Sequence, residues 1–148
     1  MFTGLIQAVG RIAEIESGKQ DIRLRIDTGK LPLEEVSLGD SIATSGVCLT
    51  VTDLPGGGFW ADVSPETLSL TTLGGKGVRD PVNLETSLTL STPLGGHLVS
   101  GHVDGVGHVE QIIEDDRFWR VRITSPANLA RYIAMKGSIC VDGTSLTV

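Results

Sequence analysis

The chain has 148 residues, of which 40% are hydrophobic and 20% are charged, so it is long enough to bury a sizeable core. The formal net charge of −6 and the lack of a basic block argue against a nucleic-acid-binding protein. No apolar run approaches the roughly 18 residues of a membrane span, and the first residues lack the basic region of a secretory signal. Because Cys48 and Cys140 match no metal-binding or redox spacing, we expect a reduced, cytoplasmic protein.

Short strand-like segments alternate with turns along the first part of the chain. Branched residues over 5–16, bent at Gly10, and the apolar–basic alternation over 22–26 predict a hairpin with its turn at 17–20. Further strands are expected over 40–44, 47–53, 59–63 and 80–84. About six short strands at close spacing favour an all-β closed barrel or sandwich.

Two short helices are predicted among these strands. Pro32, followed by two acidic residues, predicts one over 31–38. Ser64 is a suitable N-cap and Pro65 a suitable first residue for a second. The glycine-rich stretch 91–96 is the expected linker.

The chain contains an internal repeat at an offset of 97 residues, which places Gly4 on Gly101 and Cys48 on Ser145. One ungapped alignment covers 51 pairs with about 13 identities, far more than unrelated segments share. Residues 1–97 form the first unit and residues 98–148 the second, which stops at Val148. We therefore expect a duplicated fold whose second copy is incomplete in this chain.

The side chains with chemical potential are few, and each has a structural alternative. Cys48 is either a small buried residue in a strand or a nucleophile. Cys140 aligns with an alanine, which favours packing. His97, His102 and His108 lack metal-ligand spacing, so we expect no metal site, and His102 is either a surface residue or a proton carrier.

The repeated strand ends place small polar residues on one face, because alternate residues of a strand point the same way. Cys48 shares a face with Thr50, and Ser145 shares one with Thr147. Such groups can hydrogen-bond a flat heterocycle, although threonine facing solvent is also common in strands.

Four motifs in order resemble the riboflavin synthases of the α-subunit type. They are Met1–Ile6 (MFTGLI), Gly46–Val51 (GVCLTV), Gly95–Val103 (GGHLVSGHV) and Gly143–Val148 (GTSLTV), with Leu68–Gly74 (LSLTTLG) as a weaker fifth. The resemblance implies an all-β chain of two tandem six-stranded, Greek-key-like lumazine-binding barrels, with 1–97 as the first and 98–148 as the N-terminal part of the second.

The resemblance also implies an activity. Two molecules of 6,7-dimethyl-8-ribityllumazine exchange a four-carbon unit, without a cofactor or a metal, to give riboflavin and 5-amino-6-(ribitylamino)uracil. It further implies a C-terminal helix, a homotrimer with each site between the first barrel of one subunit and the second barrel of another, and association with lumazine synthase.

Residue roles carried over from the resemblance fall into two pockets. The first is expected to be lined by Gly4, Leu5, Ile6, Cys48, Leu49, Thr50, Asp62, Val63, Ser64, Pro65, Glu66 and Thr67. The second is expected to be lined by Gly101, His102, Val103, Lys136, Ser145, Leu146 and Thr147. The expected catalytic residues are Cys48 as nucleophile, His102 as proton carrier, Phe2 beside the reacting pair, and Ser145 as the counterpart of Cys48.

Two other functions are compatible with the residues. One is a lumazine- or flavin-binding protein of the same fold without turnover, and the other is an unrelated small barrel with a structural role. The presence of both Cys48 and His102 favours the enzyme.

Overall fold

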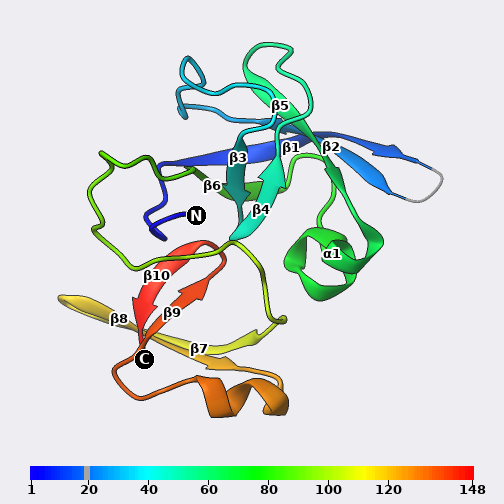
Figure 1. The fold of residues 1–148 in the computed structure, drawn as a ribbon. Helices are drawn as coiled ribbons and strands as arrows, with labels where there is room; N and C mark the ends of the chain where they lie inside the picture. Colours follow the sequence, from blue (N-terminus) through cyan, green and yellow to red (C-terminus); the bar gives the residue numbers. More distant parts are fainter. Residues whose placement is uncertain (19–20) are drawn as a thin grey trace.

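A computed structural model describes residues 1–18 and 21–148, and it is an all-β structure as predicted (Figure 1). The first unit forms one antiparallel sheet in the order β4-β3-β6-β1-β2-β5. Its strands are β1 (Ala8–Ser17), β2 (Ile22–Asp27), β3 (Ser41–Thr44), β4 (Val47–Thr50), β5 (Gly58–Val63) and β6 (Pro81–Thr86). The predicted hairpin is β1–β2, and residues 19–20 of its turn lie outside the described residues.

The two outermost strands of this sheet are also linked by backbone hydrogen bonds. Just after β4, the Thr52 amide donates to the Trp60 carbonyl oxygen (2.8 Å), and the Trp60 amide donates to the Asp53 carbonyl oxygen (2.9 Å). Because Trp60 lies in β5, these bonds show that the sheet curls and brings its two outermost strands, β4 and β5, toward each other.

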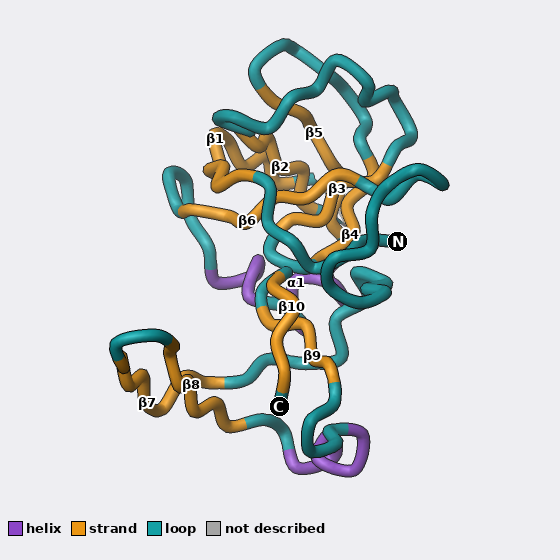
Figure 2. Tube along the Cα trace, turned by 90° about the vertical axis from the view of Figure 1, so that its left-hand side faces the viewer, coloured by secondary structure: helices purple, strands orange, loops and turns teal. Residues whose placement is uncertain are grey.

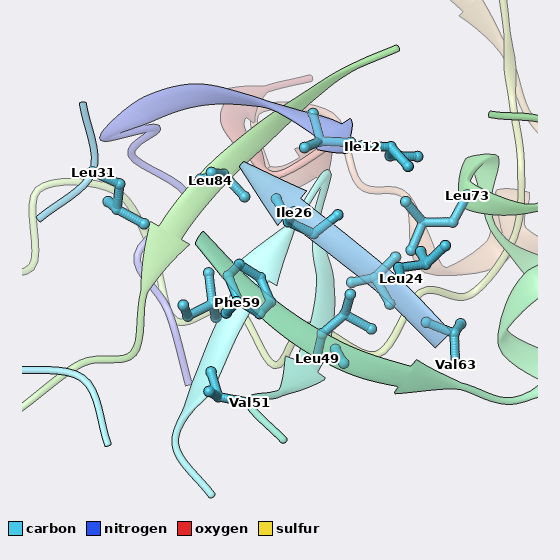
Figure 3. Close-up of a cluster of buried hydrophobic side chains, with 14 residues drawn as sticks. Ile12, Leu24, Ile26, Leu31, Leu49, Val51, Phe59, Val63, Leu73 and Leu84 are labelled. Atoms are coloured by element: carbon cyan, nitrogen blue, oxygen red, sulfur yellow. The ribbon is translucent and has the colours of Figure 1, made fainter. Parts of the chain in front are cut away.

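The core of the first unit lies inside this curled sheet (Figure 3). Alternate residues of each strand point inward, and Ile26 and Phe59 have no exposed surface at all. Burial of one such side chain stabilises the fold by about 1.5–3 kcal/mol. The cluster consists of Ile12, Leu24, Ile26, Leu31, Ile42, Val47, Leu49, Val51, Phe59, Ala61, Val63, Leu73, Val82 and Leu84.

The helix predicted at Ser64 is confirmed, and the one over 31–38 is wrong. Helix α1 (Pro65–Leu70) begins after Ser64, whose hydroxyl accepts from the Thr67 amide at 3.1 Å, and the 3₁₀ helix η1 (Thr72–Gly75) follows. Residues 31–38 form separate turns instead. Leu31 is buried in the core, and packing at this point overrides a weak local helix preference.

The second unit repeats the local geometry of the first. Its strands are β7 (His108–Asp115), β8 (Phe118–Thr124), β9 (Ser138–Val141) and β10 (Thr144–Thr147), with the 3₁₀ helix η2 (Ala127–Tyr132) between the two pairs. The β9–β10 register reproduces β3–β4 at the offset of 97, and the β7–β8 pair has its register shift at the same place as β1–β2. The duplication therefore extends from sequence to pairing.

The apolar face of the second unit is open. Ile12 and Leu24 are 1% and 2% exposed, whereas their counterparts Val109 and Val121 are 58% and 41% exposed. In the first unit β5 and β6 complete the sheet around this face, and no strand among the residues described for the second unit takes their place. Within residues 1–18 and 21–148, no helix is long and apolar enough to cross a membrane.

Candidate active site

The two units are related by a local two-fold axis at the place where they meet. Phe2 and Val99 occupy the same position of the two repeats, and they pair with each other through reciprocal backbone bonds of 2.8 and 3.0 Å. The β3–β4 turn at Gly46 abuts the β9–β10 turn at Gly143, so that the two hairpins approach each other at their turns (Figures 1 and 2). Equivalent residues therefore contact each other across the interface.

Each unit sends a short segment against the strand of the other. The Cys48 amide of β4 donates to the Gly101 carbonyl oxygen at 2.8 Å, and the Ser145 amide of β10 donates to the Gly4 carbonyl oxygen at 2.7 Å. Gly101 has a φ of +80°, and a Cβ there would lie 2.7 Å from the Cys48 Cβ. Glycine at this position permits both the conformation and the close approach.

This crossing corrects the grouping expected from the sequence. The expected first pocket combined Gly4–Ile6 with Cys48, and the expected second combined Gly101–Val103 with Ser145. In the structure Gly101 lies against Cys48 and Gly4 lies against Ser145. The alignment of the repeats shows which segments are equivalent, but it does not show which unit each segment contacts.

The first cluster surrounds Cys48. Cys48 is half-buried, and Thr50 on the same face is exposed. The partly buried Val103 packs against the core of the first unit. The antiparallel link between β4 and β5 brings this face toward the end of β5 and the start of α1, where Asp62, Ser64, Pro65 and Glu66 are exposed and Thr67 is half-buried. The side chains exposed along this edge are mostly polar, and we refer to the edge as the rim.

Two residues expected in this pocket have side chains in the core. Leu49 is 3% exposed and Val63 is 1% exposed, and both belong to the buried cluster of the first unit. Their side chains therefore stabilise the strands, and only their backbone groups are available to a ligand.

Asp62 on the rim carries an ion pair. Arg23 Nε lies 3.7 Å from Asp62 Oδ1, and the Arg23 guanidinium stacks over the Trp60 ring at 4.7 Å. The pair is about half exposed, so it contributes little to stability. Its effect is to place a guanidinium next to the carboxylate at this edge of the site.

The second cluster surrounds Ser145. Its hydroxyl lies 2.7 Å from His97 Nδ1, and its amide is held by Gly4. Ile6 lies next to Gly143, and Leu5 is exposed. Leu146 and Thr147 are exposed on β10, and the Lys136 amide donates to the Val148 carbonyl oxygen at 2.9 Å.

Phe2 and Cys140 lie inside the interface between the units. Phe2 is 1% exposed, and it packs with Ala43 and Val99 against both Cys48 and Cys140. Burial, with a smaller contribution from the charge of Glu85, raises the pKa of the Cys140 thiol above its ordinary value. The structure therefore supports a packing role for Cys140, as expected, and it gives Phe2 a contact with the thiol-bearing strand.

His102 lies at the surface, beside a large open cavity. Its amide donates to the Ser100 hydroxyl (3.2 Å), and the cavity of about 800 Å³ is lined by His102, Val109 and Ile123. Val109 and Ile123 are the counterparts of the core residues Ile12 and Ile26. This cavity is the open interior of the second unit, and we assign the candidate site to the rims around Cys48 and Ser145 instead.

Two residues of these clusters were missed by the sequence reasoning. His97 lacks metal-ligand spacing, and its place in the same motif as His102 is the one signal the sequence offers for it. Glu85 is a buried carboxylate that accepts from the Gly4 amide at 2.9 Å, and a single charged residue in a strand gives no signal of this kind. Over residues 1–18 and 21–148, no group of three or more potential metal ligands occurs.

A family model of the lumazine binding domain matches residues 3–87 and 100–148. Proteins named riboflavin synthase from Photobacterium leiognathi and Actinobacillus pleuropneumoniae are 43% and 46% identical over 148 residues, covering 100% of this chain and 68% of each relative. The riboflavin synthase of Mycobacterium tuberculosis is 46% identical over 149 residues, covering 100% of this chain and 74% of that relative.

Solved structures of the protein LumP have the same fold. LumP complexed with riboflavin superposes with a TM-score of 0.88 at 29% identity, covering 99% of this chain and 79% of LumP. LumP complexed with 6,7-dimethyl-8-(1'-D-ribityl) lumazine gives a TM-score of 0.85 at 28% identity, with 99% and 78% covered. The matches over the whole chain, together with the paired units, show that this chain belongs to the riboflavin synthase family of lumazine-binding enzymes.

Proposed function

We propose that the protein converts two molecules of 6,7-dimethyl-8-ribityllumazine into riboflavin and 5-amino-6-(ribitylamino)uracil. The observation that carries this proposal is the pair of related clusters around Cys48 and Ser145. A reaction between two copies of one molecule needs two similar sites, and a duplicated chain supplies them. The names of relatives that are 41–46% identical support the same reaction.

Holding two substrates in register accounts for a large part of such catalysis. Correct orientation of two reactants is worth about 7–11 kcal/mol in well-ordered systems. The C7 methyl group of the lumazine is acidic because its carbanion delocalises into the ring. The chain therefore needs to supply only a modest proton carrier and a nucleophile.

The proposed roles differ between the two clusters. Cys48, half-buried and backed by Phe2, is the nucleophile or its polar assistant, and the exposed imidazole of His102 carries protons. Thr50 and Asp62–Thr67 bind the ring and the ribityl chain of one substrate. Ser145, hydrogen-bonded to His97, and Thr147 with Lys136 bind the other substrate.

Assembly and location are further parts of the proposal. We propose a homotrimer in which the Cys48 cluster of one subunit faces the Ser145 cluster of another, association with lumazine synthase, and a cytoplasmic location. The exposed face of the Cys48 cluster, with Thr50 and Ser64 open to solvent, supports an approach by a second subunit.

The competing function is binding without turnover. The LumP structures hold riboflavin or a ribityllumazine, and they superpose with TM-scores of 0.88 and 0.85. Sequence identity favours the enzyme, because the riboflavin synthases share 43–46% of residues with this chain and the LumP structures share 28–29%.

Incubation of the purified protein with 6,7-dimethyl-8-ribityllumazine, followed by chromatography, tests the proposal. One riboflavin formed for every two lumazines consumed supports the enzyme. Lumazine that stays bound without riboflavin formation supports the binding protein. Failure to bind lumazine at all contradicts both functions.

A further inference from the structure

Glu85 is a buried carboxylate without a cation. Glu85 is 3% exposed, and it takes no part in the ion pairs of the described residues, which are Arg23–Asp62 and Arg25–Glu14. On β6 it stands opposite Ala43, so its side chain points out of the core toward the interface between the units. A buried charge of this kind needs hydrogen-bond donors to replace water.

The donors come from one short segment at the start of the chain. Glu85 Oε1 accepts from the Thr3 amide at 2.6 Å and from the Thr3 hydroxyl, and Oε2 accepts from the Gly4 amide at 2.9 Å. The Thr3 hydroxyl in turn accepts from the Leu5 amide at 3.1 Å. Both carboxylate oxygens are therefore used to hold residues 3–5 in one conformation.

The other side of this segment is bonded to the second unit. The Thr3 carbonyl oxygen accepts from the His97 amide at 3.0 Å, and the Gly4 carbonyl oxygen accepts from the Ser145 amide at 2.7 Å. His97 and Ser145 are also joined through their side chains at 2.7 Å. The segment thus connects Glu85 of the first unit to the His97–Ser145 pair of the second.

The equivalent segment of the second unit provides an internal comparison. Gly101 holds the Cys48 amide as Gly4 holds Ser145, and the Ser100 hydroxyl accepts from the His102 amide as Thr3 does from Leu5. The bonds of Glu85 go to the segment that holds Ser145, and not to the segment that holds Cys48.

We propose that Glu85 is a positioning residue of the Ser145 cluster. Its carboxylate fixes Thr3 and Gly4, and this segment sets the position of Ser145 and His97. Glutamine is not an adequate substitute, because it offers one acceptor oxygen and turns an NH₂ group toward an amide that also donates. The consequence for turnover rests on the proposed function, whereas the consequence for the backbone does not.

The test compares hydrogen exchange at single amides in the wild-type protein and in Glu85→Gln. The proposal expects exchange at Ser145 and His97 to become about tenfold faster or more, with exchange at Cys48 unchanged. A similar increase at Cys48 and Ser145 would show general loosening and overturn the proposal, as would no change at either. Glu34→Gln, at an exposed glutamate, is the matched control, and it should leave hydrogen exchange at Cys48 and Ser145 unchanged.

Two further variants cover the case in which Glu85→Gln does not fold. Thr3→Val removes one donor to Glu85, and it should accelerate hydrogen exchange at Ser145 by less than Glu85→Gln does. In the double variant with Glu85→Asp, it should add little to the effect of Glu85→Asp alone. Glu85→Asp keeps the charge with a shorter reach, and it should fall between wild type and Glu85→Gln. Additive effects of Thr3→Val and Glu85→Asp would overturn the proposal, because coupled groups do not act independently.

Turnover gives a second, separate readout. In a folded Glu85→Gln protein we expect kcat to fall about tenfold or more, with little change in lumazine affinity at the Cys48 cluster. Unchanged kcat with faster exchange at Ser145 would remove the kinetic role of Glu85. If the wild-type protein makes no riboflavin, the proposed function fails, and the exchange measurement still decides whether Glu85 positions Ser145.

Discussion

Phe2 and Val99 are the same residue position of two repeats, and they are hydrogen-bonded to each other in both directions. A pair of this kind lies on a local two-fold axis, so backbone contacts close to it recur at equivalent positions of the two units. The Cys48–Gly101 and Ser145–Gly4 bonds are the clearest example. The duplication therefore produces two similar clusters at one interface, with different side chains in each.

The first prediction concerns the thiol of Cys48. Cys48→Ser keeps the size and hydrogen-bonding capacity of the residue but removes the thiolate, which is the better nucleophile. We expect turnover of the lumazine to fall more than tenfold while binding is retained, as measured by product chromatography and ligand titration. Cys140→Ala is the matched control, because alanine occupies the equivalent position 43, and it should keep full turnover. Wild-type turnover in Cys48→Ser would end the assignment of the nucleophile.

The second prediction concerns His102. His102→Gln keeps a hydrogen-bonding side chain but cannot carry a proton, so the shape of the pH–rate profile should change. The profile is measured by following riboflavin formation across the pH range. His108→Gln, at an exposed position on β7, should leave the profile unchanged. An unaltered profile in His102→Gln would show that another group handles the proton.

The third prediction uses two glycines with similar backbone conformations. Gly39 (φ +90°) has no atom within 4 Å of an added Cβ, whereas a Cβ on Gly101 (φ +80°) would meet Cys48 and Phe2. Gly39→Ala should lower the free energy of unfolding by about 1–2 kcal/mol through backbone strain. Gly101→Ala should cost about 1–3 kcal/mol more through overpacking. Denaturant unfolding measures both values, and equal losses would contradict the close approach between the units.

The fourth prediction concerns pH and Cys140. Burial raises the pKa of its thiol in the folded protein above the ordinary value of 9.0, so the unfolded chain loses this proton at lower pH. The contribution of Cys140 to stability is complete below pH 9 and is lost as pH rises through the pKa of the folded state. Cys140→Ala should therefore weaken the alkaline loss of stability, as measured by thermal unfolding above and below pH 9. The same alkaline slope in both proteins would show that Cys140 titrates as it does in the unfolded chain.

The sequence predicted the local structure well and the contacts between units poorly. Apolar alternation and the Ser64 cap are local signals, and both are confirmed by β2 and α1. The segment 31–38 was mispredicted because Leu31 is fixed by the core rather than by its neighbours in the sequence.

The candidate site was harder to predict, because its grouping depends on tertiary contacts. Which unit Gly4 contacts depends on the exchange of segments across the interface, and the repeat alone carries no information on this exchange. Glu85 and His97 act through the backbone or through Ser145, so their roles became visible only with the contacts in place.

The proposed ligand site at Cys48 is built from both units, because Gly101 and Val103 of the second unit contact the first. Titration of the protein with 6,7-dimethyl-8-ribityllumazine, followed by NMR at single backbone amides, tests it directly. We predict that the signals of Cys48, Thr50, Gly101 and Val103 shift together with one dissociation constant. Shifts confined to one unit, or centred on Val109 and Ile123 in the open cavity, would contradict a site built from both units.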